Sequence, residues 1–304
     1  MNLAVRVGAV RLANPIMAAS GTFGFGPEYQ GLVNIARLGG IAVKGVSPGP
    51  WPGNPPPRVW ETEGGMLNSI GLQNPGVEVF CREDLPFLRT TKTRVVVNVI
   101  GRTIDEYCQV VERLEAESGI DALELNISCP NIKEGGMSFG QDPEHAAQVT
   151  RAVRACTKRP LWVKLSPNVA DPGAIAAAVE RVGADAISAI NTVVGMAIDV
   201  KRRRPALGGI SGGLSGPAIK PIALRVVYQV AQSVSIPIVG MGGIRSVEDV
   251  VEFLMAGASA VMVGTATFAE PGTMEAIIEE LPGYLARLEV SSVHELIGAA
   301  LPGR

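Results

Sequence analysis

The stretch Arg94–Ile127 reads RVVVNVIGRTIDEYCQVVERLEAESGIDALELNI. Its two ends, Arg94–Ile100 and Ala122–Ile127, are short apolar runs, and a helical pattern separates them. Apolar residues in these runs follow one another instead of alternating with polar ones, which is typical of parallel strands covered on both faces. The stretch therefore predicts a strand–helix–strand unit with two parallel strands.

The same kind of run recurs along the chain, and helical patterns separate most of the runs. Six more are Pro15–Ser20, Gly40–Lys44, Leu161–Leu165, Ala186–Asn191, Pro237–Met241 and Ala260–Gly264. Helix starts are marked by the N-cap and proline pairs Asp142-Pro143 and Asp171-Pro172 and by the capping-box pair Ser246 and Asp249. Eight strands alternating with helices predict an α/β protein, a (β/α)8 TIM barrel, with residues 1–304 as one domain.

Composition and charge exclude several classes of protein. Hydrophobic residues make up 47% and charged residues 18% of the chain, which is not the composition of a disordered protein. The formal net charge is −2 and the longest basic run is only Lys201–Arg204, so we expect no nucleic-acid partner. The apolar stretch Ala186–Ile198 is too short to span a membrane. Because the N-terminus lacks a signal-peptide pattern, we expect a cytoplasmic protein with no membrane contact.

The four cysteines do not form a metal or disulfide pattern. Cys81, Cys108, Cys129 and Cys156 are far apart in the sequence, with no CxxC pair, and there are only two histidines. Disulfides are rare in cytoplasmic proteins, and zinc or iron–sulfur sites need closely spaced ligands. We therefore expect no metal.

Three long segments, rich in glycine or polar residues and without predicted structure of their own, follow strand ends. They are Val46–Asn74, Asn131–Gln141 and Asp199–Gly216. Long loops in compact domains are usually functional, and barrel active sites lie at the C-terminal ends of the strands. These segments are therefore candidates for active-site loops, and Asn131–Gln141 for a lid over the substrate. The first twelve residues alternate around Gly8 and predict a hairpin that caps the other end of the barrel.

Polar side chains stand at six of the eight predicted strand ends. They are Ser20, Lys44, Asn98, Asn126, Lys164 and Asn191. Lysine is almost never fully buried unless it is paired, so a ring of such residues indicates one shared polar ligand. The alternative is a set of unrelated, solvated loop residues.

Glycines follow the last two predicted strands. Gly242-Gly243 and Gly264-Thr265 occupy the loops that often bind phosphate in barrels, where backbone N–H groups can approach the anion closely. The alternative is ordinary turn glycine, which is common in a chain with 36 glycines.

Cys129 differs from the other cysteines. It opens a polar loop directly after the run Ala122–Ile127, where a thiolate could act as base or nucleophile. The other three cysteines lie in helical patterns and are interpreted as packing residues. His145, the rival base, lies inside a predicted helix, and His294 lies far from any strand end. A further polar cluster, Asn68–Asn74, could bind a planar, amide-rich substrate or could be only a turn.

Taken together, these stretches resemble class 1 dihydroorotate dehydrogenases, and specifically type 1B, over almost the whole chain. The matching stretches are Ala19–Gly26 (ASGTFGFG), Val43–Val46, Asn68–Asn74 (NSIGLQN), Asn126–Asn131 (NISCPN), Val163–Leu165, Asn191-Thr192, Gly242-Gly243 and Gly264-Thr265. Gln73 and the SGTFGFG stretch favour type 1B.

The resemblance implies a role for each matching position. The implied FMN contacts are Ser20, Lys44, Gly45, Asn98, Asn126, Lys164, Ile190, Gly216, Gly242, Gly243, Gly264 and Thr265. The implied contacts of dihydroorotate and orotate are Lys44, Asn68, Ser69, Ile70, Gly71, Leu72, Asn126, Asn131, Asn191 and Thr192. Cys129 is implied to take a proton from C5 while hydride passes from C6 to flavin N5, and Lys164 to stabilise the charge of the reduced flavin.

The resemblance also implies partners. Type 1B enzymes pair a homodimer of FMN subunits with subunits that carry FAD and an iron–sulfur cluster and pass electrons to NAD, as a heterotetramer. Alternatives are a fumarate-dependent class 1A enzyme and another FMN barrel that reduces dihydropyrimidines or dihydrouridines. Two further alternatives are a flavin-free barrel isomerase and a non-catalytic binding subunit. In a non-catalytic subunit the polar ring would have no function.

Overall fold

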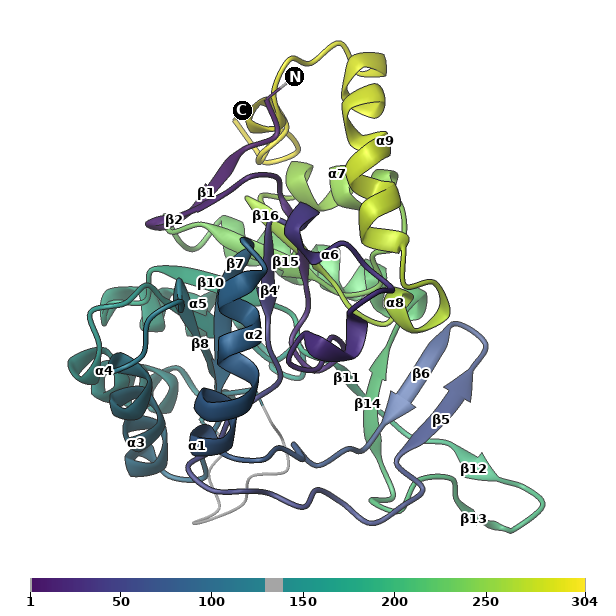
Figure 1. Ribbon diagram of the computed structural model, residues 1–304. Helices are drawn as coiled ribbons and strands as arrows, with labels where there is room; N and C mark the ends of the chain where they lie inside the picture. The colour runs from purple at the N-terminus through teal and green to yellow at the C-terminus, as the bar shows by residue number, and fades with distance from the viewer. Residues whose placement is uncertain (1, 129–138, 304) are drawn as a thin grey trace.

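The computed structural model describes residues 2–128 and 139–303 of the chain. Its centre is a closed barrel of eight parallel strands, each hydrogen-bonded to the strand that follows it in the barrel order (Figure 1). These strands are β3 (Ile16–Ala18), β4 (Gly40–Ala42), β7 (Arg94–Val99), β8 (Ala122–Asn126), β9 (Leu161–Lys164), β10 (Ala186–Ala189), β15 (Ile238–Met241) and β16 (Ala260–Val263). The pairing of β16 with β3 closes the ring and confirms the predicted (β/α)8 barrel.

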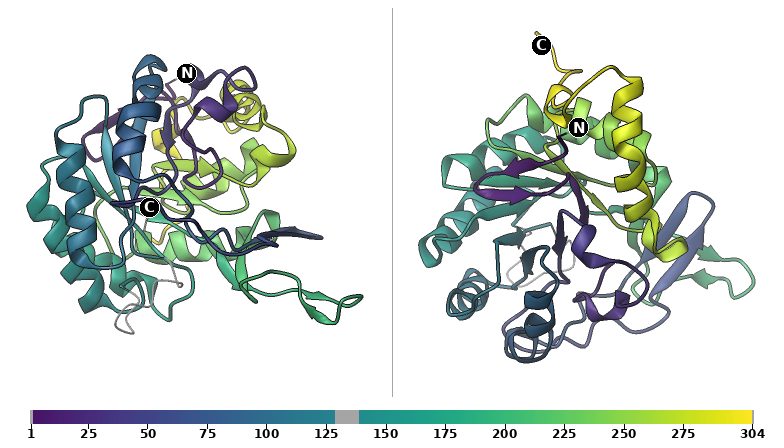
Figure 2. Two further views of the ribbon diagram at one scale, coloured as in Figure 1. Left: turned by 60° about the horizontal axis from the view of Figure 1, so that its bottom comes forward. Right: turned by 45° about the horizontal axis from the view of Figure 1, so that its top comes forward.

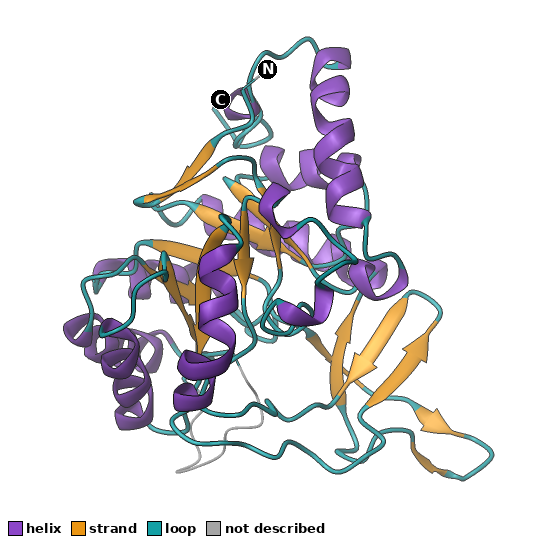
Figure 3. Cartoon of the chain, in the orientation of Figure 1, coloured by secondary structure: helices purple, strands orange, loops and turns teal. Residues whose placement is uncertain are grey.

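Helices surround the barrel (Figure 3). The α-helices are α1 (Val77–Val79), α2 (Leu85–Thr90), α3 (Ile104–Glu115), α4 (Pro143–Cys156), α5 (Pro172–Arg181), α6 (Lys220–Ala231), α7 (Val247–Met255), α8 (Ala266–Ala269) and α9 (Thr273–Arg287). A π-helical turn, η3 (Phe80–Asp84), joins α1 to α2, and 3-10 turns are η1 (Pro27–Tyr29), η2 (Ile35–Arg37), η4 (Pro217–Ile219) and η5 (Val293–Glu295). Asp142, Asp171 and Ser246 cap α4, α5 and α7 as predicted: Asp142 accepts from two backbone N–H groups, and Asp171 and Ser246 accept from one each.

Two of the three long segments are not the structureless loops that the sequence predicted. Val46–Asn74 contains β5 (Val59–Thr62) and β6 (Gly65–Asn68), and Asp199–Gly216 contains β13 (Arg204–Pro205) and β14 (Gly212–Ser215). With β11 (Val193–Gly195), strands β14, β6 and β5 form a four-stranded antiparallel sheet, while β12 (Ile198–Asp199) pairs with β13. Figure 2 shows these strands extending from one side of the barrel. They form a second sheet beside the barrel instead of a set of structureless loops.

The N-terminal hairpin lies where the sequence predicted it. Strands β1 (Val5–Val7) and β2 (Val10–Leu12) pair antiparallel around Gly8. Gly8 packs against the backbone of Asp185, just before β10, and Arg94 at the start of β7 donates from Nε to the carbonyl of Arg11 at 3.1 Å. The hairpin therefore covers the N-terminal ends of the strands, opposite the predicted active site. No helix within residues 2–128 and 139–303 is long and apolar enough to cross a membrane.

The ionisation of Asp84 makes the stability of the folded chain depend on pH. Burial, together with the carboxylates of Glu28 and Glu83, raises the pKa of Asp84 to about 6 from an ordinary value of 3.8. The folded chain therefore binds this proton more tightly than the unfolded chain, and the resulting stability is lost as pH rises through about 6. We expect Asp84→Asn to raise the free energy of unfolding at neutral pH by ~1 kcal/mol, less than for a fully buried carboxyl because Asp84 is partly exposed. In acid the same substitution should leave the free energy of unfolding nearly unchanged.

Urea denaturation at the two pH values measures this difference. Glu83→Gln removes only one of the two neighbouring charges that raise this pKa, so it should give a smaller gain in the free energy of unfolding at neutral pH. An equal gain for Asp84→Asn at both pH values would contradict a carboxyl that ionises at a cost in the folded chain.

Candidate active site

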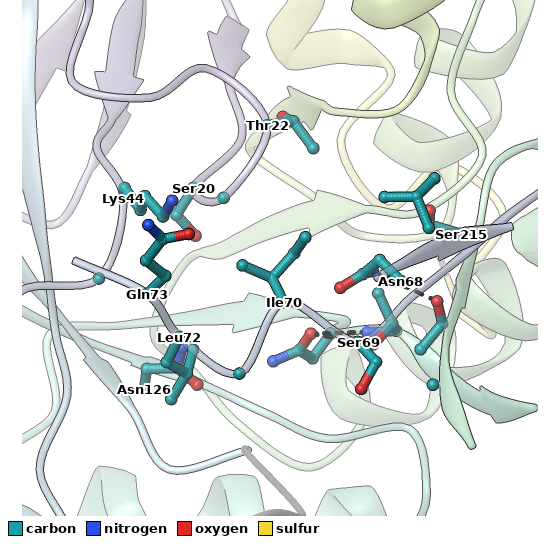
Figure 4. Close-up of a pocket in the computed structure, with 18 of the residues that line it drawn as sticks. Ser20, Thr22, Lys44, Asn68, Ser69, Ile70, Leu72, Gln73, Asn126 and Ser215 are labelled. Carbon is teal, nitrogen blue, oxygen red and sulfur yellow. Dashed lines mark hydrogen bonds between the residues drawn. The ribbon is translucent and has the colours of Figure 1, made fainter. Parts of the chain in front are cut away.

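A cavity of about 380 Å³ lies at the C-terminal ends of the barrel strands. The barrel contributes the residues that end or follow its strands, and the four-stranded sheet and the segment 68–73 contribute the opposite wall. Its lining includes Ser20, Gly21, Thr22, Lys44, Gly45, Val59, Met66, Asn68, Ser69, Ile70, Gly71, Leu72, Gln73, Asn98, Asn126, Lys164, Asn191, Thr192, Val194, Ser211, Gly212, Gly213, Ser215 and Phe268. Figure 4 shows Ser20 beside Lys44 at one end of the cavity and Asn68 and Ser215 toward the other. All six polar side chains of the predicted ring are therefore in one place.

Three members of the ring are almost fully buried. Asn98 is 1% exposed, and Asn126 and Lys164 are each 5% exposed. The parallel register sets Asn126 directly beside Lys164 on adjacent strands, which places their side chains on the same face of the sheet. Lys164 Nζ donates to Ser20 Oγ at 2.8 Å, so the strand β9 and the segment after β3 are joined across the barrel.

Glu124 is the residue of this site that sequence analysis missed. It lies in β8 two positions before Asn126 and therefore on the same, inward face. It is 0% exposed, and its Oε2 accepts from Asn98 Nδ2 at 2.5 Å and from Ser20 Oγ at 3.0 Å. The available signal was a charged residue inside an otherwise apolar strand, because Glu is almost never fully buried without partners.

A second group of hydrogen bonds joins the ends of β8 and β10. Asn191 Nδ2 donates to Ser128 Oγ at 2.5 Å, and Ser128 Oγ donates to Asn126 Oδ1 at 2.8 Å. The backbone N–H of Thr192 donates to Asn191 Oδ1 at 2.7 Å. These bonds fix the amide planes of both asparagines at the cavity wall.

The predicted substrate cluster Asn68–Asn74 is held in place by hydrogen bonds to neighbouring segments of the chain. Asn54 Nδ2 donates to Ser69 Oγ at 2.9 Å, and Arg58 donates from Nη1 to Gln73 Oε1 at 2.6 Å. Asn68, at the end of β6, donates from Nδ2 to the carbonyl of Gly213 on β14 at 3.3 Å. The cluster is therefore a supported wall of the cavity and more than a simple turn.

The predicted phosphate glycines lie beside this cavity and do not line it, and the same is true of Ile190. Gly243 has φ of 78°, and a Cβ there would lie 2.9 Å from the carbonyl oxygen of Gly216 and from the backbone nitrogen of Lys220. Glycine is therefore required at this position. Thr265 lies at the start of α8, and its methyl group is close to Gly216. The loops after β14, β15 and β16 thus gather near a short extra helix, which is where barrels often bind phosphate.

Lys44 is half-buried at the edge of the cavity. Burial lowers the pKa of its ammonium group; Glu28 opposes this shift and Arg58 adds to it. A lysine in this environment can still pair with an anion, but it loses its charge at a lower pH than an exposed lysine.

Comparison with known proteins identifies the family. Residues 2–285 match the family model for dihydroorotate dehydrogenase. The chain belongs to the dihydroorotate dehydrogenase family. It is 54% identical over 299 residues to the dihydroorotate dehydrogenase B (NAD(+)), catalytic subunit, of Alkaliphilus metalliredigens (strain QYMF), covering 98% of this chain and 99% of that one. Proteins of the same name from Alkaliphilus oremlandii (strain OhILAs) and Geotalea daltonii (strain DSM 22248 / JCM 15807 / FRC-32) are each 52% identical over 98% of both chains.

The range matched by the dihydroorotate dehydrogenase model, residues 2–285, spans the positions of all predicted site residues, from Ser20 to Thr265. Two of them, Cys129 and Asn131, lie outside the described residues, as does most of the predicted lid Asn131–Gln141. The rival base His145 does not line the cavity; its Nδ1 lies 3.4 Å from Asp142 Oδ1. His294 lies at the opposite end, with Nε2 3.0 Å from the carbonyl oxygen of Ala4.

The three described cysteines lie on the helical layer of this dihydroorotate dehydrogenase fold. Cys81 is buried, and burial raises the pKa of its thiol to about 11. Cys108 and Cys156 are half-buried on α3 and α4, and burial and its neighbour Cys156 raise the pKa of Cys108 to about 12. The thiols of Cys81 and Cys108 therefore stay protonated at neutral pH, which makes them poor nucleophiles and poor bases there. Within residues 2–128 and 139–303, no three His, Cys, Asp or Glu side chains are arranged to hold a metal ion.

Proposed function

We propose that this chain oxidises dihydroorotate to orotate with a bound FMN. It would act as the catalytic subunit of a dihydroorotate dehydrogenase B and pass electrons through a partner subunit to NAD. The observation that carries this proposal is the polar ring in one cavity, which includes Ser20, Asn98, Asn126, Lys164 and Asn191. The chain is also more than half identical to a relative that is named dihydroorotate dehydrogenase B (NAD(+)), catalytic subunit. A ring of this kind has no function in a barrel that serves only as a binding partner.

The residues present fit FMN. At Gly243 the backbone lies so close to the backbone of Gly216 and Lys220 that no side chain fits. Helix α8 begins directly after Gly264-Thr265. This combination suits the phosphate of the cofactor. Ser20, Asn98, Asn126 and Lys164 supply the hydrogen-bonding groups expected for a polar ring system, with Lys44 and Gly45 beside them. When bound, FMN supplies the hydride acceptor.

The chain's own residues would bind the substrate and move one proton. Asn68, Asn126 and Asn191 present amide groups that can pair with the donors and acceptors of a pyrimidine ring. The rest of the proposed substrate contacts are Lys44, Ser69, Ile70, Gly71, Leu72, Asn131 and Thr192. Cys129 takes the proton from C5 of dihydroorotate, and the Lys164 ammonium stabilises negative charge that develops beside it.

An absorbance spectrum of the purified chain before and after dihydroorotate addition tests this function. We expect a yellow protein that releases FMN on denaturation and bleaches with dihydroorotate. A colourless chain that cannot be reconstituted would favour a flavin-free barrel. A yellow chain that bleaches only with a dihydropyrimidine or dihydrouridine would reassign the substrate.

The electron acceptor is tested separately. We propose a homodimer of this chain paired with subunits that carry FAD and an iron–sulfur cluster. The isolated chain should therefore reduce a dye with dihydroorotate but reduce NAD very slowly. Rapid reduction of NAD by the chain alone, or efficient use of fumarate, would reassign the subclass.

Lys44 should make orotate binding sensitive to alkaline pH. Because the pKa of Lys44 is lowered, its positive charge disappears below the usual lysine range as pH rises. Affinity for the orotate anion should fall over the same pH range, as measured by flavin fluorescence titration. Lys44→Arg keeps its charge throughout, since arginine is always protonated in proteins. Loss of affinity with the same pH profile in that variant would assign the effect to another group.

A further inference from the structure

Glu124 has no place in the roles proposed so far. It is fully buried in β8 and does not line the cavity, so it would touch neither substrate nor cofactor. A buried carboxylate is costly unless other groups compensate its charge. Its surroundings compensate one carboxylate oxygen, Oε2, by two separate paths, while Oε1 is buried without a hydrogen-bond partner among the described residues.

The first path joins Glu124 to a lysine. Lys164 Nζ donates to Ser20 Oγ at 2.8 Å, and Ser20 Oγ donates to Glu124 Oε2 at 3.0 Å. The hydroxyl of Ser20 has a single proton, so it can accept from the ammonium and donate to the carboxylate at the same time. Among the described residues the two charged groups make no direct ion pair, and Ser20 is the bridge between them.

The second path runs through the amides of the cavity wall. Asn191 donates to Ser128, Ser128 to Asn126, Asn126 Nδ2 to Asn98 Oδ1 at 3.3 Å, and Asn98 Nδ2 to Glu124 Oε2 at 2.5 Å. Every bond in this path donates toward Glu124. An ionised carboxylate only accepts hydrogen bonds, so it suits the end at which the donors converge.

The opposite end of the path imposes the same direction. The backbone N–H groups of Ser128 and Thr192 donate to Asn126 Oδ1 at 3.3 Å and to Asn191 Oδ1 at 2.7 Å. A backbone N–H cannot accept, so each of these amides must turn its oxygen toward it. Fixed donors at one end and a fixed acceptor at the other leave one arrangement for the amides between them.

We propose that Glu124 is the positioning residue of this site. Its carboxylate neutralises the Lys164 ammonium through Ser20 and holds Asn98 so that the asparagines present their donors and acceptors in one direction. The consequences for FMN rest on the proposed function, but the pairing of Glu124 with Lys164 does not.

Glu124→Gln tests the role of the negative charge while it keeps the size of the side chain. Glutamine keeps the length of the side chain and an oxygen that can accept from Asn98 and Ser20, but it has no charge. The Lys164 ammonium is then buried without a counter-charge, which destabilises a folded chain more than removal of both partners does. Lys164→Met removes the other charge and leaves Glu124 in the same position.

A double-mutant cycle on the unfolding of the flavin-free chain tests the pairing. The variants are Glu124→Gln, Lys164→Met and the double variant, with Glu112→Gln on the exposed face of α3 as the matched control. We expect the double variant to be more stable than the two single changes predict together, by about tenfold in the folding equilibrium. The effects of Glu112→Gln and Lys164→Met on the free energy of unfolding should be additive. Additive effects of Glu124→Gln and Lys164→Met would overturn the proposal.

The flavin-bound chain provides a second readout. Without the carboxylate the site carries more positive charge, which favours the negatively charged reduced cofactor. We expect the midpoint potential of Glu124→Gln to rise by an amount that corresponds to about tenfold, or about 30 mV for a two-electron couple. A purely structural residue would lower the stability and leave the potential unchanged, and that result would also overturn the proposal.

Two further results keep the test decisive. If Glu124→Gln does not fold, Ser20→Ala replaces it in the cycle with Lys164→Met, because it removes the bridge while both charges stay; additivity there overturns the proposal. If the parent chain binds no flavin, the proposed function fails, and the cycle on the flavin-free chain still tests the pairing.

Discussion

Replacing Cys129 with alanine should slow the reduction of the bound flavin by dihydroorotate by ~10²–10⁴-fold, the usual contribution of a general base. The proposed base is removed, while the described cavity residues that are proposed to bind orotate are unchanged. Cys129→Ala should therefore keep its FMN and its affinity for orotate. Stopped-flow bleaching of the flavin measures the reductive step separately from reoxidation.

Cys129→Ser and a distant cysteine complete this experiment. A hydroxyl is a poorer proton acceptor than a thiol, whose free pKa is about 8.5, so the serine variant should keep some activity that moves to higher pH. Cys156→Ala is the matched control, because Cys156 ends α4 shortly before β9 begins, at the end of the barrel away from the cavity. If Cys129→Ala reduced its flavin within a few-fold of the parent, the base would be another residue of the cavity and not Cys129.

The barrel could be predicted because its strands are encoded locally. The run Leu161–Leu165 became β9 (Leu161–Lys164), and Ala260–Gly264 became β16 (Ala260–Val263). Each strand is a short apolar segment between turn signals, and the repetition of strand and helix leaves few ways to connect them. The closed barrel then brings the C-terminal ends of all strands to one place, so the polar ring followed from topology alone.

The four-stranded sheet could not be predicted in the same way. Strand β6 pairs with β14, and the two lie in segments that are far apart along the chain. The sequence of β5, VWET, is partly exposed, and β14 reads GGLS, which contains none of the usual strand formers. Their pairing depends on the barrel that positions both segments, and no local pattern contains that information.

Glu124 was missed for a related reason. It lies in the run ALELNI, which was interpreted as a continuous apolar strand from its neighbours Leu123 and Leu125. The two-residue period of a strand puts Glu124 on the same face as Asn126, so the sequence did contain the placement. What it did not contain was the partner: Ser20 and Lys164 approach Glu124 only after the barrel closes.

Replacing Lys164 with methionine should slow reduction of the flavin by dihydroorotate by ~10²–10³-fold, the usual cost of removing one group that stabilises developing charge. Methionine preserves much of the side-chain length but carries no charge and donates no hydrogen bond to Ser20. The loss should appear in the rate of flavin bleaching at saturating dihydroorotate more than in substrate affinity, because the stabilised charge develops during the reaction. An equal loss in affinity with an unchanged rate would place Lys164 among groups that only bind.

The double variant Glu124→Gln/Lys164→Met separates the two functions of this lysine. In Lys164→Met the Glu124 carboxylate is left buried without its compensating charge, so part of any loss of FMN or stability comes from the unpaired carboxylate. Neutralising Glu124 as well should restore much of the stability and the FMN content. It should not restore the rate, because no positive charge returns to the cavity wall beside Asn126. Recovery of the rate together with the stability would mean that Lys164 acts only by compensating Glu124. The charge that stabilises the reaction would then come from elsewhere, and Lys44 is the other lysine that lines the described cavity.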